Sequence, residues 1–215
     1  MLISFDGIQR SGKSTIIAAL KVILEKKLQR KVIVTEWNSY PEIQSIINTK
    51  KNEKSYTPYT WFALHFADFS LRYEETILPA IKRDEIVICD RYYYTSFVRD
   101  SLKGIDMNYL KDVFSYFRKP DLNFFLIQDP TICYQRHLKN STFIEFHPYN
   151  SGQDIFVDSA LSEKEKYLKY QKCSIIKYKE IHSHLNNSYL FDMAYLDFDS
   201  VLLEVTDRIL EKLRL

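Results

Sequence analysis

The stretch from Phe5 to Thr15, FDGIQRSGKST, contains GIQRSGKS at 7–14, which matches the phosphate-loop pattern GxxxxGK[ST]. In this pattern backbone N–H groups surround phosphate oxygens, the lysine neutralises phosphate charge and the serine hydroxyl joins a bound Mg²⁺. A short apolar run at 2–5 precedes the loop, and apolar residues recur at helical spacing after it. The sequence therefore predicts that ATP phosphates bind the residues Gly7, Ile8, Gln9, Arg10, Ser11, Gly12, Lys13, Ser14 and Thr15.

The rest of the chain alternates apolar runs with helical patterns. Four further runs read as buried strands, at 31–35, 85–90, 122–127 and 188–193. Helices are expected between them, one of which begins with Thr57 as N-cap and Pro58 at its first position and is kinked or ended by Pro79. This alternation predicts an α/β P-loop fold in a single domain spanning 1–215, with a five-stranded parallel sheet covered by helices on both faces.

Residues 139–160 interrupt the alternation. They read KNSTFIEFHPYNSGQDIFVDSA, have no sustained period and contain no arginine. Loops of this length in compact chains are typically functional lids or disordered segments. We assign them to a lid segment. The next stretch, EKEKYLKYQK at 163–172, is read as the solvated flank of a helix.

Composition excludes several classes of protein. The chain has 215 residues, with 30 Lys and Arg against 28 Asp and Glu, so nothing suggests a general nucleic-acid binder. Three widely spaced cysteines, with no CxxC pair, argue against a disulfide framework or a zinc site. With neither a leader sequence nor an apolar run of membrane length, we expect a cytoplasmic protein that binds neither nucleic acid nor membrane.

A second chemical element follows the strand that ends in IVICD. Asp90 closes this strand, and the carboxyl ends of parallel strands meet at one edge of a sheet, where ligands bind. A carboxylate there can hold Mg²⁺ with Ser14, and the guanidinium of Arg91 can bind an acceptor phosphate. We therefore assign Ser14 and Asp90 to the metal and Arg91 to the acceptor. A purely structural Asp–Arg pair is the alternative.

The chain shares several segments with one enzyme family, namely FDGIQRSGKST at 5–15, LHFADFSLRYEETILPAI at 64–81, DRYYYTS at 90–96 and KPDLNFFLIQDP at 119–130. In order and spacing they resemble the thymidylate kinases among the nucleoside monophosphate kinases. The resemblance implies MgATP as donor, a nucleoside monophosphate as acceptor, most simply dTMP converted to dTDP, and a homodimer. By position it also implies that Arg91 contacts the acceptor phosphate and that Phe66 or its neighbours face the base.

The resemblance also points to a catalytic arginine. Some family members carry it in the phosphate loop and others in the lid. Because 139–160 contains no arginine, we predict that Arg10 stabilises charge on the transferring phosphoryl group, together with Lys13 and Arg91. The alternative is that Arg10 is ordinary loop surface.

Departures from the family pattern fall on the acceptor side. Gln9 stands where the family has an acid that meets the sugar 3′-hydroxyl, and Phe69 stands where a base-reading arginine is expected. The nearest arginine, Arg72, lies one helical turn further on, and Arg99 with Asp100 replaces an aromatic–glutamine pair. We expect acceptor contacts from Gln9, Glu36, Phe66, Phe69, Arg72, Arg91 and Arg99.

Two other functions remain open at this point. A deoxynucleoside kinase would use Glu36, in TEW, as a general base that deprotonates a sugar hydroxyl. A nucleotide-binding module would grip ATP without efficient transfer. The lid and Arg10 argue against the module, since binding alone needs neither.

Overall fold

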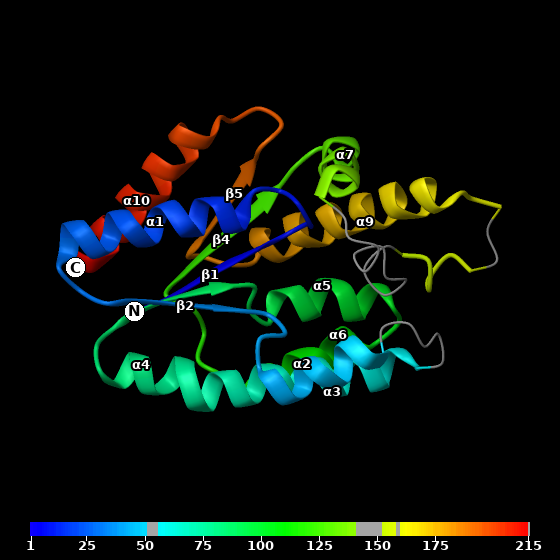
Figure 1. Cartoon of the computed structure of the whole chain (residues 1–215), viewed down its shortest axis with the longest axis horizontal. Helices are drawn as coiled ribbons and strands as arrows, with labels where there is room; N and C mark the ends of the chain where they lie inside the picture. Colours follow the sequence, from blue (N-terminus) through cyan, green and yellow to red (C-terminus); the bar gives the residue numbers. More distant parts are fainter. Residues whose placement is uncertain (51–55, 141–151, 158–159, 215) are drawn as a thin grey trace.

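The protein is built around one parallel sheet. The computed structural model describes residues 1–50, 56–140, 152–157 and 160–214, and within these ranges five strands pair in the order β2-β3-β1-β4-β5. The strands are β1 (Leu2–Gly7), β2 (Val32–Glu36), β3 (Ile86–Asp90), β4 (Leu122–Ile127) and β5 (Ser188–Asp192), all in parallel register (Figure 1). The prediction of a five-stranded parallel α/β sheet is confirmed.

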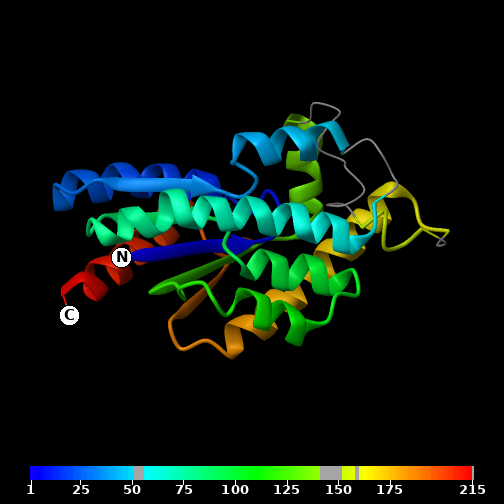
Figure 2. The same ribbon diagram turned by 90° about the horizontal axis from the view of Figure 1, so that it is seen from below.

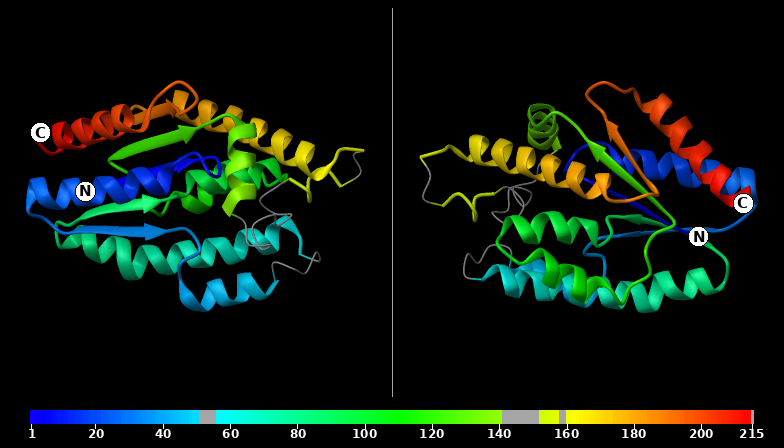
Figure 3. Two further views of the ribbon diagram at one scale, coloured as in Figure 1. Left: turned by 45° about the horizontal axis from the view of Figure 1, so that its top comes forward. Right: turned by 180° about the vertical axis from the view of Figure 1, so that it is seen from behind.

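Helices cover both faces of the sheet. On one face α1 (Lys13–Leu28) and α10 (Phe198–Arg214) pack on Ile3, Phe5 and Phe124. The opposite face carries α3 (Pro58–Arg72), α5 (Tyr94–Leu102), α6 (Met107–Phe114) and α9 (Glu163–Ser183). The figures show α1 and α10 together on one side, with α3 and α6 on the other (Figures 1 and 3). Because neighbouring residues of β1 and β4 face different helix layers, both strands are buried throughout.

The helix predicted to start at Thr57 continues past Pro79. Thr57 accepts the N–H of Thr60 and Pro58 is the first helical residue, as predicted. After α3 the chain forms a π-helical turn, η1 (Tyr73–Ile77), and continues as α4 (Leu78–Lys82), so that Figure 2 shows one long helical run. In a regular α-helix the ring of Pro79 would clash with the carbonyl four residues earlier. The wider π turn, closed by the N–H of Leu78 on the carbonyl of Tyr73, changes that register and accommodates the proline.

Two further helices complete the described chain. The first, α2 (Pro41–Lys50), was not expected from the sequence, whereas α7 (Pro130–Asn140) has Asp129 as its predicted cap, accepting the N–H of Thr131 at 2.7 Å. No helix in the described ranges is long and apolar enough to cross a membrane.

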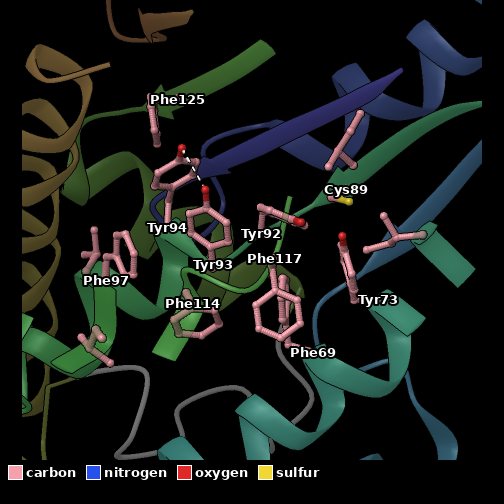
Figure 4. Close-up of a cluster of buried hydrophobic side chains, with 14 of the residues drawn as sticks. Phe69, Tyr73, Cys89, Tyr92, Tyr93, Tyr94, Phe97, Phe114, Phe117 and Phe125 are labelled. Carbon is pink, nitrogen blue, oxygen red and sulfur yellow. Dashed lines mark hydrogen bonds between the residues drawn. The ribbon is translucent and has the colours of Figure 1, made fainter. Parts of the chain in front are cut away.

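An aromatic cluster fills the space between the sheet and the helices α3 and α6. Figure 4 shows the rings of Phe69, Phe114 and Phe117 beside those of Tyr92 and Tyr93. Phe69 has no exposed surface, and its ring centroid lies 4.8 Å from that of Phe117 and 4.9 Å from that of Tyr92. This cluster fixes the position of α3 against the end of β3, where Asp90 and Arg91 lie.

The predicted lid lies partly outside the described residues, because 141–151 and 158–159 are not among them. Of its described residues, 139–140 are the last two of α7, which the predicted lid overlaps, and 152–157 are attached to the body of the protein. The Asp154 carboxylate pairs with the Lys103 ammonium at 2.5 Å, and the Lys169 ammonium lies 4.3 Å from the centre of the Phe156 ring. The assignment of 139–160 to a lid stays a prediction.

Candidate active site

The phosphate loop connects β1 to α1 at the carboxyl edge of the sheet. Gly7 has φ 135°, and a Cβ at this position would lie 2.0 Å from the backbone oxygen of Leu126 in the neighbouring strand. Only glycine therefore allows the chain to turn so close to β4. Arg10, at φ 57°, and Gly12, at φ 102°, are also left-handed, which gives the loop its tight curvature.

Lys13 lies inside this loop. Its ammonium donates to the carbonyl oxygen of Ile8 at 2.7 Å and to the Ser11 hydroxyl at 3.3 Å. Burial and the positive charge of Arg91 lower the pKa of Lys13 to about 7, although Asp90 opposes the shift. Anionic phosphates in the loop would raise this pKa again, because they favour the charged ammonium.

Ser14 and Asp90 meet on the exposed side of the loop. The Ser14 hydroxyl donates to the Asp90 carboxylate at 2.6 Å. Magnesium in nucleotide sites is held by one or two protein oxygens together with phosphates and water, so these two side chains suit an ion that arrives with a nucleotide. Nowhere in the described chain do three His, Cys, Asp or Glu side chains converge into an all-protein metal site.

Arg91 is turned back toward the start of the loop. Its φ is 74°, and its guanidinium donates to the carbonyl oxygen of Gly7 at 2.8 Å and to the Thr95 hydroxyl at 3.3 Å. Beneath it, the buried carboxylate of Asp6 accepts a hydrogen bond from the Thr95 hydroxyl at 2.6 Å. Burial raises the pKa of Asp6 to about 6, against the opposing effects of the Thr95 bond and the Arg91 charge.

Arg10 is connected to α7 through its backbone. The Arg136 guanidinium donates to the carbonyl oxygen of Arg10 at 3.0 Å. Nothing in the sequence pattern singles out Arg136, because it lies in the middle of an ordinary helical pattern. Its contact with the loop is visible only once α7 is placed beside residues 10–15.

The loop residues line two cavities. The larger has a volume of about 440 Å³, and its walls are Arg10 to Thr15 with Gln128, Arg136, Met193, Leu196 and Phe198. The smaller has a volume of only about 10 Å³ and is lined by Gly7, Ile8, Gln9, Arg91, Val98, Arg99, Tyr170, Gln171, Ser174 and Tyr178. Residues 7–9 of the loop therefore face the smaller cavity, and residues 10–15 face the larger one.

The smaller cavity contains polar groups from α9 that sequence reasoning missed. The expectation that 163–172 is a solvated flank is corrected here, since Tyr170 is 3% exposed and Gln171 1%. Within the part of the chain that the structure describes, the Tyr170 hydroxyl and the Gln171 amide nitrogen have no hydrogen-bond partner. Buried polar atoms are normally paired, so these two are candidates to contact a ligand.

The remaining acceptor candidates are not all brought together. Arg99 lines the small cavity with Gln9 and Arg91, and Glu36 is exposed at the end of β2, paired in register with Asp90. Phe66 is half-buried against the rings of Phe62, Phe114 and Phe117.

Two candidates are buried away from any ligand surface. Phe69 belongs to the aromatic cluster and has no exposed surface on which a base could stack. Arg72 is 2% exposed, and its guanidinium donates to the backbone carbonyl of Arg91. The structure therefore places Phe69 in the core and Arg72 behind Arg91.

Comparisons with known proteins point to one enzyme family. Residues 5–183 match the family model described as thymidylate kinase. The chain is 37% identical over 192 residues to probable thymidylate kinase 2 of Saccharolobus solfataricus, a match that covers 89% of this chain and 87% of that protein. It is 28% identical over 188 residues to the probable thymidylate kinase of Methanocaldococcus jannaschii, covering 86% and 93%. The crystal structure of the thymidylate kinase from Ehrlichia chaffeensis has the same fold, with a TM-score of 0.67 at 18% identity over 97% of each chain.

Proposed function

The chain belongs to the thymidylate kinase family, and on this premise we propose that it transfers the γ-phosphoryl group of ATP to dTMP, forming dTDP and ADP. The observation that carries the proposal is the pair of cavities on one phosphate loop. A transfer between two nucleotides needs two adjacent sites, and along the loop residues 7–9 line the smaller cavity while the next residues, 10–15, line the larger.

The larger cavity suits the donor. It combines loop N–H groups and Lys13 for the phosphates with Arg136, Leu196 and Phe198 for a base. A guanidinium plane and apolar side chains together favour a flat aromatic ring. We place the ATP phosphates on residues 10–15 and its base toward Arg136.

The lining of the smaller cavity suits an acceptor phosphate chemically, and the cavity must widen from about 10 Å³ to admit one. Arg91 and Arg99 supply positive charge there, and Gln9 supplies an uncharged hydrogen-bonding group. A phosphate monoester is already ionised near neutral pH, so its oxygen can attack without a general base. This fits a cavity whose described lining contains no carboxylate.

The chemistry asked of the protein is positioning and charge neutralisation. In an in-line transfer the acceptor oxygen bonds to the γ-phosphorus while the bond to ADP breaks, and charge spreads over the transferring oxygens. Lys13 and Arg10 would neutralise that charge from the loop, and Arg91 would hold the acceptor. Ser14 and Asp90 would hold Mg²⁺, which supplies further positive charge to the donor phosphates.

The proposal is tested by product identification. We expect purified protein with γ-labelled ATP, Mg²⁺ and dTMP to give labelled dTDP, identified by chromatography, with one ADP for each dTDP. A Lys13→Met variant serves as the control, because it keeps the loop but removes the charge. Release of ADP that does not depend on dTMP would contradict the proposal.

The deoxynucleoside kinase alternative depends on Glu36. This carboxylate lies at the correct edge of the sheet, next to Asp90 in register, but the family comparison favours a phosphate acceptor. A Glu36→Gln variant separates the two. It should leave dTMP phosphorylation intact if the acceptor needs no base, and abolish activity if Glu36 deprotonates a sugar hydroxyl.

A further inference from the structure

The peptide group between Arg91 and Tyr92 is held from both sides by opposite charges. Its carbonyl oxygen accepts hydrogen bonds from both terminal nitrogens of Arg72, at 3.4 and 3.3 Å. Its N–H, on Tyr92, donates to the two oxygens of the Asp6 carboxylate at 3.2 and 3.3 Å. We call the side chains of Asp6 and Arg72 the peptide clamp.

Both members of the peptide clamp are buried, at 0% exposure for Asp6 and 2% for Arg72. The Arg72 guanidinium lies 5.3 Å from the centre of the Phe69 ring and 5.7 Å from that of Trp37. Its Nε has no hydrogen-bond partner in the described residues. Burying charge in an apolar cluster is costly, and here the two buried charges hold a single backbone peptide.

The peptide that the clamp holds is strained on its Arg91 side. Arg91 has φ 74°, a conformation that costs a non-glycine residue on the order of 1–3 kcal/mol. This conformation turns the Arg91 guanidinium back to the carbonyl of Gly7, at 2.8 Å. If the peptide were released, Arg91 would relax to an extended conformation and its guanidinium would leave the small cavity.

We propose that Asp6 and Arg72 are positioning residues that fix the guanidinium of Arg91 for the acceptor phosphate. This inference rests on the proposed function, in which Arg91 binds that phosphate. It replaces the sequence-based expectation that Arg72 touches the acceptor itself. A positioning role also explains why Arg72 is buried one helical turn beyond Phe69, the position at which the family has an arginine that contacts the base.

The kinetic test compares Arg72→Met, Arg72→Lys and Asp6→Asn with the unaltered enzyme. Methionine keeps the apolar stem and loses both donors, so we expect kcat/KM for dTMP to fall by about 10- to 100-fold, mainly through KM. The KM for ATP should stay within about twofold, since the donor cavity is not touched. Arg72→Lys keeps one charged donor and should recover most of the loss.

Matched controls come from the other edge of the sheet. There the Asp121 carboxylate accepts the N–H of Leu2 at 2.7 Å and pairs with Arg118. Arg118→Met and Asp121→Asn remove the same chemical groups from an ion pair whose carboxylate holds a backbone N–H at the opposite end of β1. They should lower stability without changing KM for dTMP.

A structural readout keeps the test independent of activity. Amide hydrogen exchange at Tyr92 should accelerate in Arg72→Met and in Asp6→Asn, but not in Arg118→Met. The double variant Asp6→Asn/Arg72→Met should lose less than the product of the two single losses in kcat/KM, because one peptide is released in each case. If Arg72→Met does not fold, Asp6→Asn carries the same comparison.

The inference is overturned if a folded Arg72→Met variant keeps kcat/KM for dTMP within about twofold, or if its KM for ATP rises equally. Unchanged exchange at Tyr92 would also overturn it. If the unaltered enzyme does not phosphorylate dTMP, the proposed function fails instead, and the exchange experiment still decides whether the clamp holds the peptide.

Discussion

At the scale of single residues, the phosphate loop carries most of the inference. Gly7 and Lys13 could be assigned from spacing alone. Only glycine allows the close turn at position 7, and the lysine of the pattern supplies the positive charge for the phosphates. Arg10 could be assigned only by contrast with the arginine-free segment 139–160. The contact of its carbonyl with Arg136 adds a structural reason for its left-handed conformation.

Arg10→Ala tests the proposed role of the loop arginine. We expect turnover to fall by about 10³-fold, because a guanidinium aimed at the transferring phosphoryl group stabilises the transition state more than bound ATP. ATP affinity, measured by calorimetry, should change little, and Arg10→Lys should retain part of the rate. Turnover within about tenfold of the unaltered enzyme would show that Arg10 is ordinary loop surface.

Asp6 should give the folded protein a measurable pH dependence. Its pKa is raised by burial from 3.8 to about 6, so the folded state binds the proton more tightly than the unfolded state. The contribution of protonated Asp6 to the free energy of unfolding is complete below about pH 4. It is lost as the pH rises through 6, and the total loss is up to about 3 kcal/mol.

Urea denaturation from pH 4 to pH 7 measures this effect. The free energy of unfolding of Asp6→Asn should lose the part of the pH dependence that Asp6 causes, while Asp121→Asn serves as the control. An unchanged slope in Asp6→Asn would show that Asp6 does not titrate in this range.

At the scale of elements, the sequence predicted what local chemistry determines. The caps at Thr57 and Asp129 and the buried strand at 122–127 follow from residue type and spacing, and the structure confirms them. The π turn η1 was not predictable, because it depends on how the aromatic cluster fits against α3 as well as on Pro79. The helix α2 is not among the predicted elements, although Ile43, Ile46 and Ile47 recur at helical spacing.

The aromatic cluster should be a major source of stability for α3. Phe69 has no exposed surface, so Phe69→Ala would leave a cavity among buried rings. We expect the free energy of unfolding, measured by urea denaturation, to fall by about 3–5 kcal/mol. Phe66→Ala is the matched control on the same helix. Because the ring of Phe66 is half-buried, its removal should lower the free energy of unfolding clearly less. Equal decreases in the two variants would contradict the placement of Phe69 in the core.

At the scale of the whole molecule, the site is assembled from segments far apart in sequence. The carboxyl-edge rule was enough to bring Asp90 and Arg91 to the phosphate loop. The rule could not predict that Tyr170 and Gln171 lie at the site, because their burial depends on how α9 packs across β1 and α5. The same packing places Arg99 in the small cavity.

The oligomeric state and the domain organisation are also questions at this scale. A single domain and the homodimer implied by the family both stay predictions. Light scattering of the purified protein should give twice the chain mass of 25.7 kDa. A mass equal to one chain would contradict the homodimer without affecting the proposed reaction.

We propose that the small cavity binds the phosphate group of dTMP, which is the acceptor of the transferred phosphoryl group. The most direct measurement is kcat/KM with labelled ATP across a panel of acceptors: dTMP, the other common nucleoside monophosphates, and thymidine. We expect dTMP to rank first and thymidine to be phosphorylated at background level. Preference for thymidine would contradict the account, and so would a rate that no acceptor increases.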